Sequence, residues 1–204
     1  MIQAEIAKFL KDHEQYRQRT IVIVDFGNVE KWKNGLGWDV GIQELSKLVK
    51  SFSYGDTRLR RFYYGSDFGP SESSTVMIPW SKEFLERAKW NNFEICTKRV
   101  KYIRCTDKNG YYFEKKCDLD VEMAVDLIQE KDNYDTIVLF SGDGDLVRAL
   151  EYLIKVHGKK IIFMSARGHI GREVIDAQKA GVISEILFAD DFEYRLRMNR
   201  FMRR

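Results

Sequence analysis

The sequence predicts an α/β fold in which a mostly parallel central sheet lies between two layers of helices. Short apolar runs alternate with amphipathic segments along nearly the whole chain. The runs at 20–25 and 135–140 show no polar alternation, as expected for strands that helices cover on both faces. Alternating strands and helices favour a parallel sheet, because each helix returns the chain to the edge where the next strand starts.

The first half of the chain supplies an N-terminal helix, four further elements and a hairpin. Apolar residues recur on one side of a helix at 2–17. Residues 93–116 are typical of an extended hairpin, because Asn109-Gly110 supplies the positive-φ residues that tight hairpin turns favour. Between these segments we expect, in chain order, a strand at 20–25, a helix at 40–51, a strand at 58–65 and a helix at 80–91.

Helices and strands alternate without interruption in the second half. Each expected strand is a short apolar run, and each expected helix carries apolar residues three or four positions apart. Parallel neighbours need such crossover connections, so this half also predicts a parallel arrangement. In order, the elements are a helix at 119–130, a strand at 135–140, a helix at 145–157, a strand at 159–164, a helix at 171–179 and a strand at 183–188.

The composition is that of a globular intracellular protein. The 204 residues are 44% hydrophobic and 32% charged, enough for one well-cored domain. The apolar runs are too short to cross a bilayer and the N-terminus does not resemble a signal peptide, so we expect no membrane association and a cytoplasmic location. The three cysteines form no CxxC pair, which indicates reduced thiols rather than a zinc ribbon.

The distribution of charge favours a polyanionic partner more than the net charge of +3 does. Basic residues cluster at 58–61, 98–104 and 195–204, whereas acidic residues cluster at 118–126 and 143–145. Separate acidic and basic clusters suit a polyanion that is held near a bound cation. For any single cluster, a solvated surface is the simpler interpretation.

Carboxylates stand where two of the predicted strands end. Asp25 closes the strand at 20–25, and Asp143 and Asp145 follow the strand at 135–140 between glycines. Ligands of open α/β sheets bind outside the carboxyl ends of the strands, so we expect these groups at one edge. A capping role for Asp145, with Asp143 as a turn residue, is the structural alternative.

A third segment is expected to place a carboxylate at the same edge of the sheet, where the strands end. Asp120 shares the apolar stripe of the helix at 119–130 and should point toward the sheet, where it needs a partner. Asp118 is expected to cap this helix or face water, and Asp126 to be solvated or to support the site. Clustered carboxylates repel unless a hard cation joins them, and oxygen-only ligands favour Mg²⁺ or Mn²⁺. Such ions activate water and stabilise charge on a phosphodiester.

Several residues are candidate substrate contacts. Trp32 and Lys33 follow the first strand, and an aromatic ring beside a lysine can stack a base while the cation holds a phosphate. Packing in the core is the alternative for Trp32. Arg148, after the acidic loop, and Arg167, after the fifth strand, could reach phosphates, with a solvated surface as the alternative. Arg197 and Arg200 share a stripe of the basic helix expected at 193–204, for which a solvated tail is the alternative.

Three motifs carry a resemblance to a known family: VDFGN with Asp25 and Asn28, CDLDVEMAVD with Asp120, and SGDGD at 141–145. In this order they resemble the NYN domain, a group of PIN-like nucleases that includes the LabA-like (DUF88) proteins. The resemblance spans about residues 20–192. It implies a PIN-like Rossmannoid three-layer fold and a metal-dependent ribonuclease. The implied metal ligands are Asp25, Asp120, Asp143 and Asp145, and the supporting groups are Asn28, Ser141, Asp118 and Asp126.

The resemblance also predicts the domain boundaries of the chain, and it leaves alternative functions open. We expect a helical extension at 1–19, the nuclease domain at 20–192 and a basic C-terminal helix at 193–204. RNA is the expected partner, and homo-oligomerisation stays open. Leu146 departs from the Phe that usually follows SGDGD. The alternatives are a non-catalytic RNA-binding or assembly module of the same fold, and a Rossmannoid phosphohydrolase. Such a phosphohydrolase would need a DxD motif after the first strand, but Asp25 is followed by Phe26 and Gly27.

Overall fold

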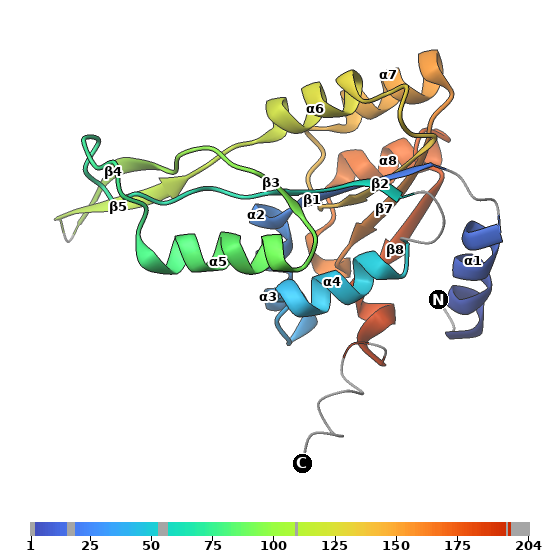
Figure 1. The fold of residues 1–204 in the computed structure, drawn as a ribbon, viewed down its shortest axis with the longest axis horizontal. Coiled ribbons are helices and arrows are strands. Elements are labelled where there is room, and N and C mark those ends of the chain that lie inside the picture. Colours follow the sequence, from blue (N-terminus) through green and yellow to red (C-terminus); the bar gives the residue numbers. More distant parts are fainter. Residues whose placement is uncertain (1–2, 16–18, 53–56, 109, 195, 197–204) are drawn as a thin grey trace.

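A six-stranded parallel sheet forms the centre of the structure, a computed structural model that describes residues 3–15, 19–52, 57–108, 110–194 and 196 (Figure 1). Its order is β3-β2-β1-β6-β7-β8, and each neighbouring pair is parallel. The predicted fold class is therefore confirmed. The strands are β1 (Thr20–Asp25), β2 (Thr57–Tyr63), β3 (Glu94–Cys96), β6 (Thr136–Phe140), β7 (Lys160–Ser165) and β8 (Glu185–Phe188).

Helices cover both faces of this sheet (Figure 1). One face packs against α1 (Gln3–Gln15), α4 (Ile42–Lys50) and α5 (Pro79–Trp90). The opposite face packs against α6 (Asp120–Gln129), α7 (Val147–His157) and α8 (Arg172–Lys179). Two short helices, α2 (Phe26–Val29) and α3 (Lys33–Leu36), follow β1. None of the helices in these described ranges is long and apolar enough to cross a membrane.

The central strands are apolar throughout because successive side chains enter different cores. In β1, Val22 and Val24 join the core under α4 and α5, whereas Ile21 and Ile23 join the core under α6 and α7. Burying one such side chain contributes roughly 1.5–3 kcal/mol. This two-sided burial explains why the run at 20–25 lacks the polar alternation of a half-exposed strand.

The order of the strands reverses between β1 and β6. From β1 the chain continues to β2 and β3 on one side, and from β6 to β7 and β8 on the other. Such a switch point opens a crevice at the carboxyl ends of the two strands. Val24 pairs with Phe140, so the next residues, Asp25 and Ser141, meet at this crevice.

The hairpin prediction is correct in its outer part and wrong at its start. Residues 94–96 form β3, which pairs in parallel with β2 at the edge of the main sheet. The hairpin itself consists of β4 (Lys101–Asp107) and β5 (Gly110–Lys116), and it extends away from the sheet (Figure 1). Ile95 packs against the core, which explains why this segment joins the main sheet. Gly110 has a φ of +128°, and Asn109 lies outside the described residues.

Candidate active site

Asp25 is fixed at the end of β1 by two hydrogen bonds. The Ser141 hydroxyl donates to one carboxylate oxygen at 2.8 Å, and the backbone N–H of Asn28 donates to the other at 3.2 Å. Burial raises the pKa of Asp25 above its usual value, although both hydrogen bonds act in the opposite direction. The Asn28 side-chain oxygen accepts a hydrogen bond from the Trp32 indole at 3.2 Å. The two predicted supporting groups, Asn28 and Ser141, thus lie beside Asp25.

The loop after β6 folds around its own polar groups. The backbone N–H of Asp143 donates to the Ser141 hydroxyl at 3.1 Å, and that of Asp145 donates to the Asp143 carboxylate at 3.1 Å. Gly142 has no room for a side chain, because a Cβ there would collide with the His169 carbonyl. Asp145 does not cap α7, which has Leu146 at its N-cap position, so the capping interpretation is wrong.

Asp120 completes the group from the first turn of α6. Oxygens of Asp120, Asp143 and Asp145 lie within 4.8 Å of one another. Burial raises the pKa of Asp120 to about 7, and the nearby charges of Asp118, Asp25 and Asp143 act in the same direction. Three mutually repelling carboxylates form an arrangement that a cation would stabilise.

A polar pocket of about 390 Å³ holds these groups together with lysines. Asp25 lines this pocket but is not one of the three residues that converge within 4.8 Å. The walls thus carry both carboxylates and lysines. The carboxylates could bind a metal ion, and the lysines could bind a phosphate beside it. The charged residues of this acidic pocket are Asp25, Asp118, Asp120, Asp143, Asp145, Glu114, Lys31, Lys115 and Lys116.

The other two predicted supporting residues have separate environments. Asp118 lines the acidic pocket, and its carboxylate accepts a hydrogen bond from the backbone N–H of Asp120 at 3.1 Å. Asp126 lies farther along α6. It accepts a hydrogen bond from the Tyr63 hydroxyl at 2.6 Å and forms an ion pair with Arg61 at 3.2 Å. Asp126 therefore fastens α6 to the sheet.

The structure places the candidate substrate contacts in different environments. Trp32 is completely buried in the core and cannot stack a base. Arg167 pairs with Asp191 through two hydrogen bonds of 2.9 and 2.7 Å, both from one guanidinium nitrogen, and its side chain is 46% exposed. Lys33 and Arg148 are exposed, and Arg148 pairs with Glu151 at 3.3 Å. Arg197 and Arg200, and most of the expected helix at 193–204, lie outside the described residues.

Sequence reasoning missed the lysines that enter the pocket. Lys31 comes from the short 3-10 helix after α2 (Glu30–Trp32), and Lys115 and Lys116 come from the end of β5. The closeness of Lys116 to Asp118 and Asp120 in the sequence was an available signal. No local pattern indicates that Lys115 would lie near Asp25, because that proximity depends on how the hairpin packs.

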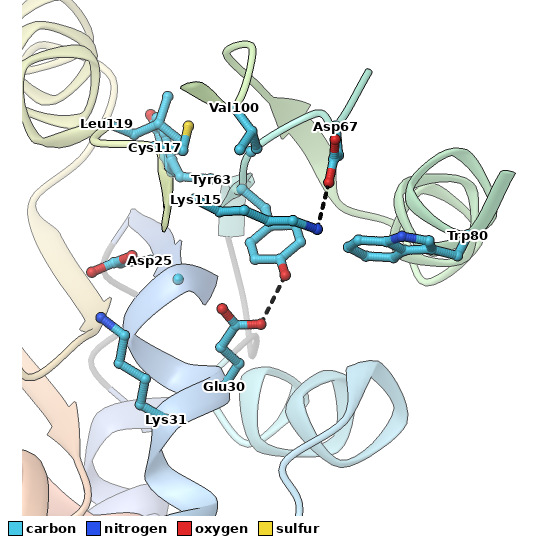
Figure 2. Close-up of a pocket in the computed structure, with 13 residues that line it drawn as sticks. Asp25, Glu30, Lys31, Tyr63, Asp67, Trp80, Val100, Lys115, Cys117 and Leu119 are labelled. Carbon is cyan, nitrogen blue, oxygen red and sulfur yellow. Dashed lines mark hydrogen bonds and ion pairs between the residues drawn. The ribbon is translucent and has the colours of Figure 1, made fainter. Parts of the chain in front are cut away.

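A second pocket of about 210 Å³ adjoins the first through Asp25, Lys31 and Lys115. In Figure 2, Asp25 and Lys31 lie at one end and Trp80 at the other, with Lys115 between them. The Tyr64 hydroxyl donates to Glu30 at 2.8 Å across this space. The two pockets together form a continuous lining from the acidic cluster to the base of the hairpin.

This fold and its acidic pocket define a class of α/β protein with a candidate cation site at the strand-order switch point. The chain belongs to the NYN domain family, which matches residues 19–185. Over 85 residues it is 36% identical to the low amplitude and bright protein LabA of Synechococcus elongatus, a match to 42% of this chain and 45% of LabA. The matched segment thus spans less than half of that relative.

A solved structure has the same fold. A protein of unknown function from Vibrio parahaemolyticus superposes with a TM-score of 0.62 at 19% sequence identity. The superposition covers 85% of this chain and 94% of the other. At this level of identity the likeness concerns the fold alone.

Proposed function

We propose that this protein is a divalent-metal-dependent ribonuclease that hydrolyses phosphodiester bonds at the acidic pocket. The observation that carries the proposal is the convergence of Asp120, Asp143 and Asp145 within 4.8 Å at the strand-order switch point. Membership of a family of PIN-like nucleases supports the same activity. RNA is proposed as the substrate because it is the substrate that the family resemblance implies.

The donor set fits a hard cation. Each of the three converging residues offers a carboxylate oxygen, the ligand type that Mg²⁺ and Mn²⁺ prefer. Asp120, Asp143 and Asp145 would hold the ion, and Asp25 lies on the wall of the same pocket. A divalent ion bound there supplies activation of water and compensation of negative charge on the phosphodiester.

The protein's own residues supply position and charge. Lys31, Lys115 and Lys116 line the same pocket as the carboxylates. Lys31 and Lys116 can hold the non-bridging oxygens of a phosphate, whereas the Lys115 ammonium pairs with Asp67 at 2.9 Å. Ser141 and the Asn28 backbone keep both oxygens of Asp25 oriented. Water replaces one ester oxygen on phosphorus, and the departing oxygen leaves with a proton.

The test is the Asp143→Asn variant assayed on labelled RNA and DNA with Mg²⁺ or Mn²⁺. The amide keeps the size of the side chain but removes a charge that the cation needs, so RNA cleavage should fall by orders of magnitude while folding is retained. Asp132→Asn is the control, because the Asp132 side chain is exposed and pairs with its neighbour Lys131 at the surface. Unchanged cleavage by Asp143→Asn, or full activity in EDTA, would contradict the proposal.

A further inference from the structure

One face of the β4–β5 hairpin carries a row of aromatic side chains. Residues that face each other across an antiparallel pair share a face, and here Arg104 pairs with Phe113 and Thr106 with Tyr111. The ring centroids of Tyr111 and Phe113 are 6.1 Å apart, and those of Phe113 and Tyr102 are 6.2 Å apart. Tyr111 is 62% exposed and Phe113 is 47% exposed. The row therefore presents aromatic surface to a partner.

Cations accompany the rings along this face. The Arg104 guanidinium lies 4.1 Å from the centroid of the Tyr111 ring. At the base of the hairpin, the Lys115 ammonium lies 5.5 Å from the Tyr102 ring and 5.6 Å from the Trp80 ring. Alternating rings and cations are the pattern with which proteins hold the bases and phosphates of single strands.

The row leads directly into the site. Lys115 and Trp80 line the 210 Å³ pocket, whose far end is formed by Asp25 and Lys31 (Figure 2). Lys115 also lines the acidic pocket. A strand of seven residues such as β5 spans ~23 Å, so the hairpin extends the site well beyond the acidic cluster.

The base of the hairpin is held to the domain by a buried carboxylate. Asp67, which is 1% exposed, accepts hydrogen bonds from the Tyr102 hydroxyl at 2.7 Å and from Lys115 at 2.9 Å. One donor comes from β4 and the other from β5. The direction of the hairpin relative to the acidic pocket is thus fixed by specific contacts.

We propose that this face, formed by Tyr102, Arg104, Tyr111, Phe113 and Lys115 and continued by Trp80, is a binding track for single-stranded RNA that leads the strand to the acidic pocket. The proposal rests on the proposed function and names the form of its substrate. The charge of the segment suits a polyanion, because residues 98–116 contain seven cations and two acids. The cations are Lys98, Arg99, Lys101, Arg104, Lys108, Lys115 and Lys116, and the acids are Asp107 and Glu114.

The aromatic row selects for unpaired bases. In a duplex the base faces are stacked on one another and cannot reach a protein ring, whereas a single strand can offer each base in turn. A duplex would meet only the cations of the hairpin. The track therefore predicts a preference for single strands that a purely electrostatic surface would lack.

The test compares two faces of the same strand. The double variant Tyr111→Ala/Phe113→Ala removes rings from the track, and Tyr112→Ala removes a ring that is 51% exposed on the opposite face. Affinity is measured by fluorescence anisotropy in EDTA, with labelled RNA of about 12 nucleotides and the matching duplex. The double variant should lose about a hundredfold in affinity for the single strand, roughly tenfold for each ring. Duplex affinity and the Tyr112→Ala variant should change little.

Failure of the track and failure of the nuclease give different results. If the wild-type protein binds single strands through these rings but cleaves no RNA, the binding track is supported and the proposed nuclease activity is contradicted. If the protein cuts RNA but the double variant binds single strands as tightly as the wild type, the track is wrong. If the double variant instead changes the association state in sedimentation while RNA affinity is unchanged, the face is a surface for self-association and the proposal is overturned.

Discussion

At the scale of single residues, Asp67 shows how a buried charge is tolerated in this protein. It is almost fully buried, yet its carboxylate accepts hydrogen bonds from Lys115, Tyr102 and the backbone N–H of Gly69. Burial acts to raise the pKa of Asp67, but these hydrogen bonds outweigh it, so the pKa lies below its ordinary value. The charged form is therefore the one that stabilises the folded protein.

The Asp67→Asn variant should lose about 2 kcal/mol of unfolding free energy at pH 7, a typical value for hydrogen bonds to a charged group. Because the folded pKa is lowered, the contribution of Asp67 is fully present above the unfolded pKa of about 4 and disappears as the pH falls through the folded value. Urea unfolding of both proteins should give stabilities that converge below about pH 4. A difference that stays constant down to pH 2 or so would contradict this account.

At the scale of elements, the position of Asp120 depends on how α6 is fastened. Arg61, on β2, is 9% exposed and forms ion pairs with Asp126 of α6, with Glu130 at the C-cap of α6 and with Glu94 of β3. The Tyr63 hydroxyl adds a hydrogen bond of 2.6 Å to Asp126. This network ties the second half of α6 to two strands, while the first turn presents Asp120 to the pocket.

The Asp126→Ala variant should cost roughly 3 kcal/mol, because it leaves part of the Arg61 charge and the Tyr63 hydroxyl without their partner. It should also weaken the response to divalent ions, because α6 then holds Asp120 less firmly. Chemical denaturation measures the first effect, and a metal titration followed by thermal shift measures the second. Asp176→Ala, which removes exposed pairs with Arg172 and Lys179, is the matched control. Equal stability of the two variants would refute a fastening role.

Some features of these elements can be predicted from local sequence, and others cannot. The two-sided apolar runs of β1 and β6 are local signals, and the parallel register then brings Asp25 beside Ser141. The burial of Trp32 has no such signal, because a tryptophan after a strand can face the core or water depending on helices that are distant in the chain. The start of the hairpin lacks a local signal for the same reason, since β3 is selected by pairing with β2. The ion pair between Arg167 and Asp191 has no local signal either, because the two residues are 24 positions apart.

At the scale of the whole molecule, the acidic pocket opposes the stability of the fold. Asp120, Asp143 and Asp145 hold their oxygens within 4.8 Å, and Asp25 lies nearby with a raised pKa. Like charges at this distance destabilise the folded state, since the unfolded chain separates them. The two hydrophobic cores on either side of the sheet supply the stability against which this repulsion acts.

A divalent ion should remove this repulsion and raise the melting temperature. An ion that binds only the folded state contributes about 2.7 kcal/mol at a concentration of 100 times its Kd. For a domain of this size each kcal/mol shifts the midpoint by about 2–4 °C, so saturating Mg²⁺ or Mn²⁺ should raise it by about 5–10 °C. Differential scanning fluorimetry with and without EDTA measures the shift.

The Asp120→Asn variant separates repulsion from general damage to the fold. Removing one charge from the group should raise the metal-free melting temperature and at the same time abolish most of the metal-induced shift, because repulsion and ion binding arise from the same oxygens. Asp132→Asn should change neither quantity, since Asp132 pairs with Lys131 at the surface. A lower metal-free midpoint in Asp120→Asn, with the full metal response retained, would show that Asp120 stabilises the fold and that the ion binds elsewhere.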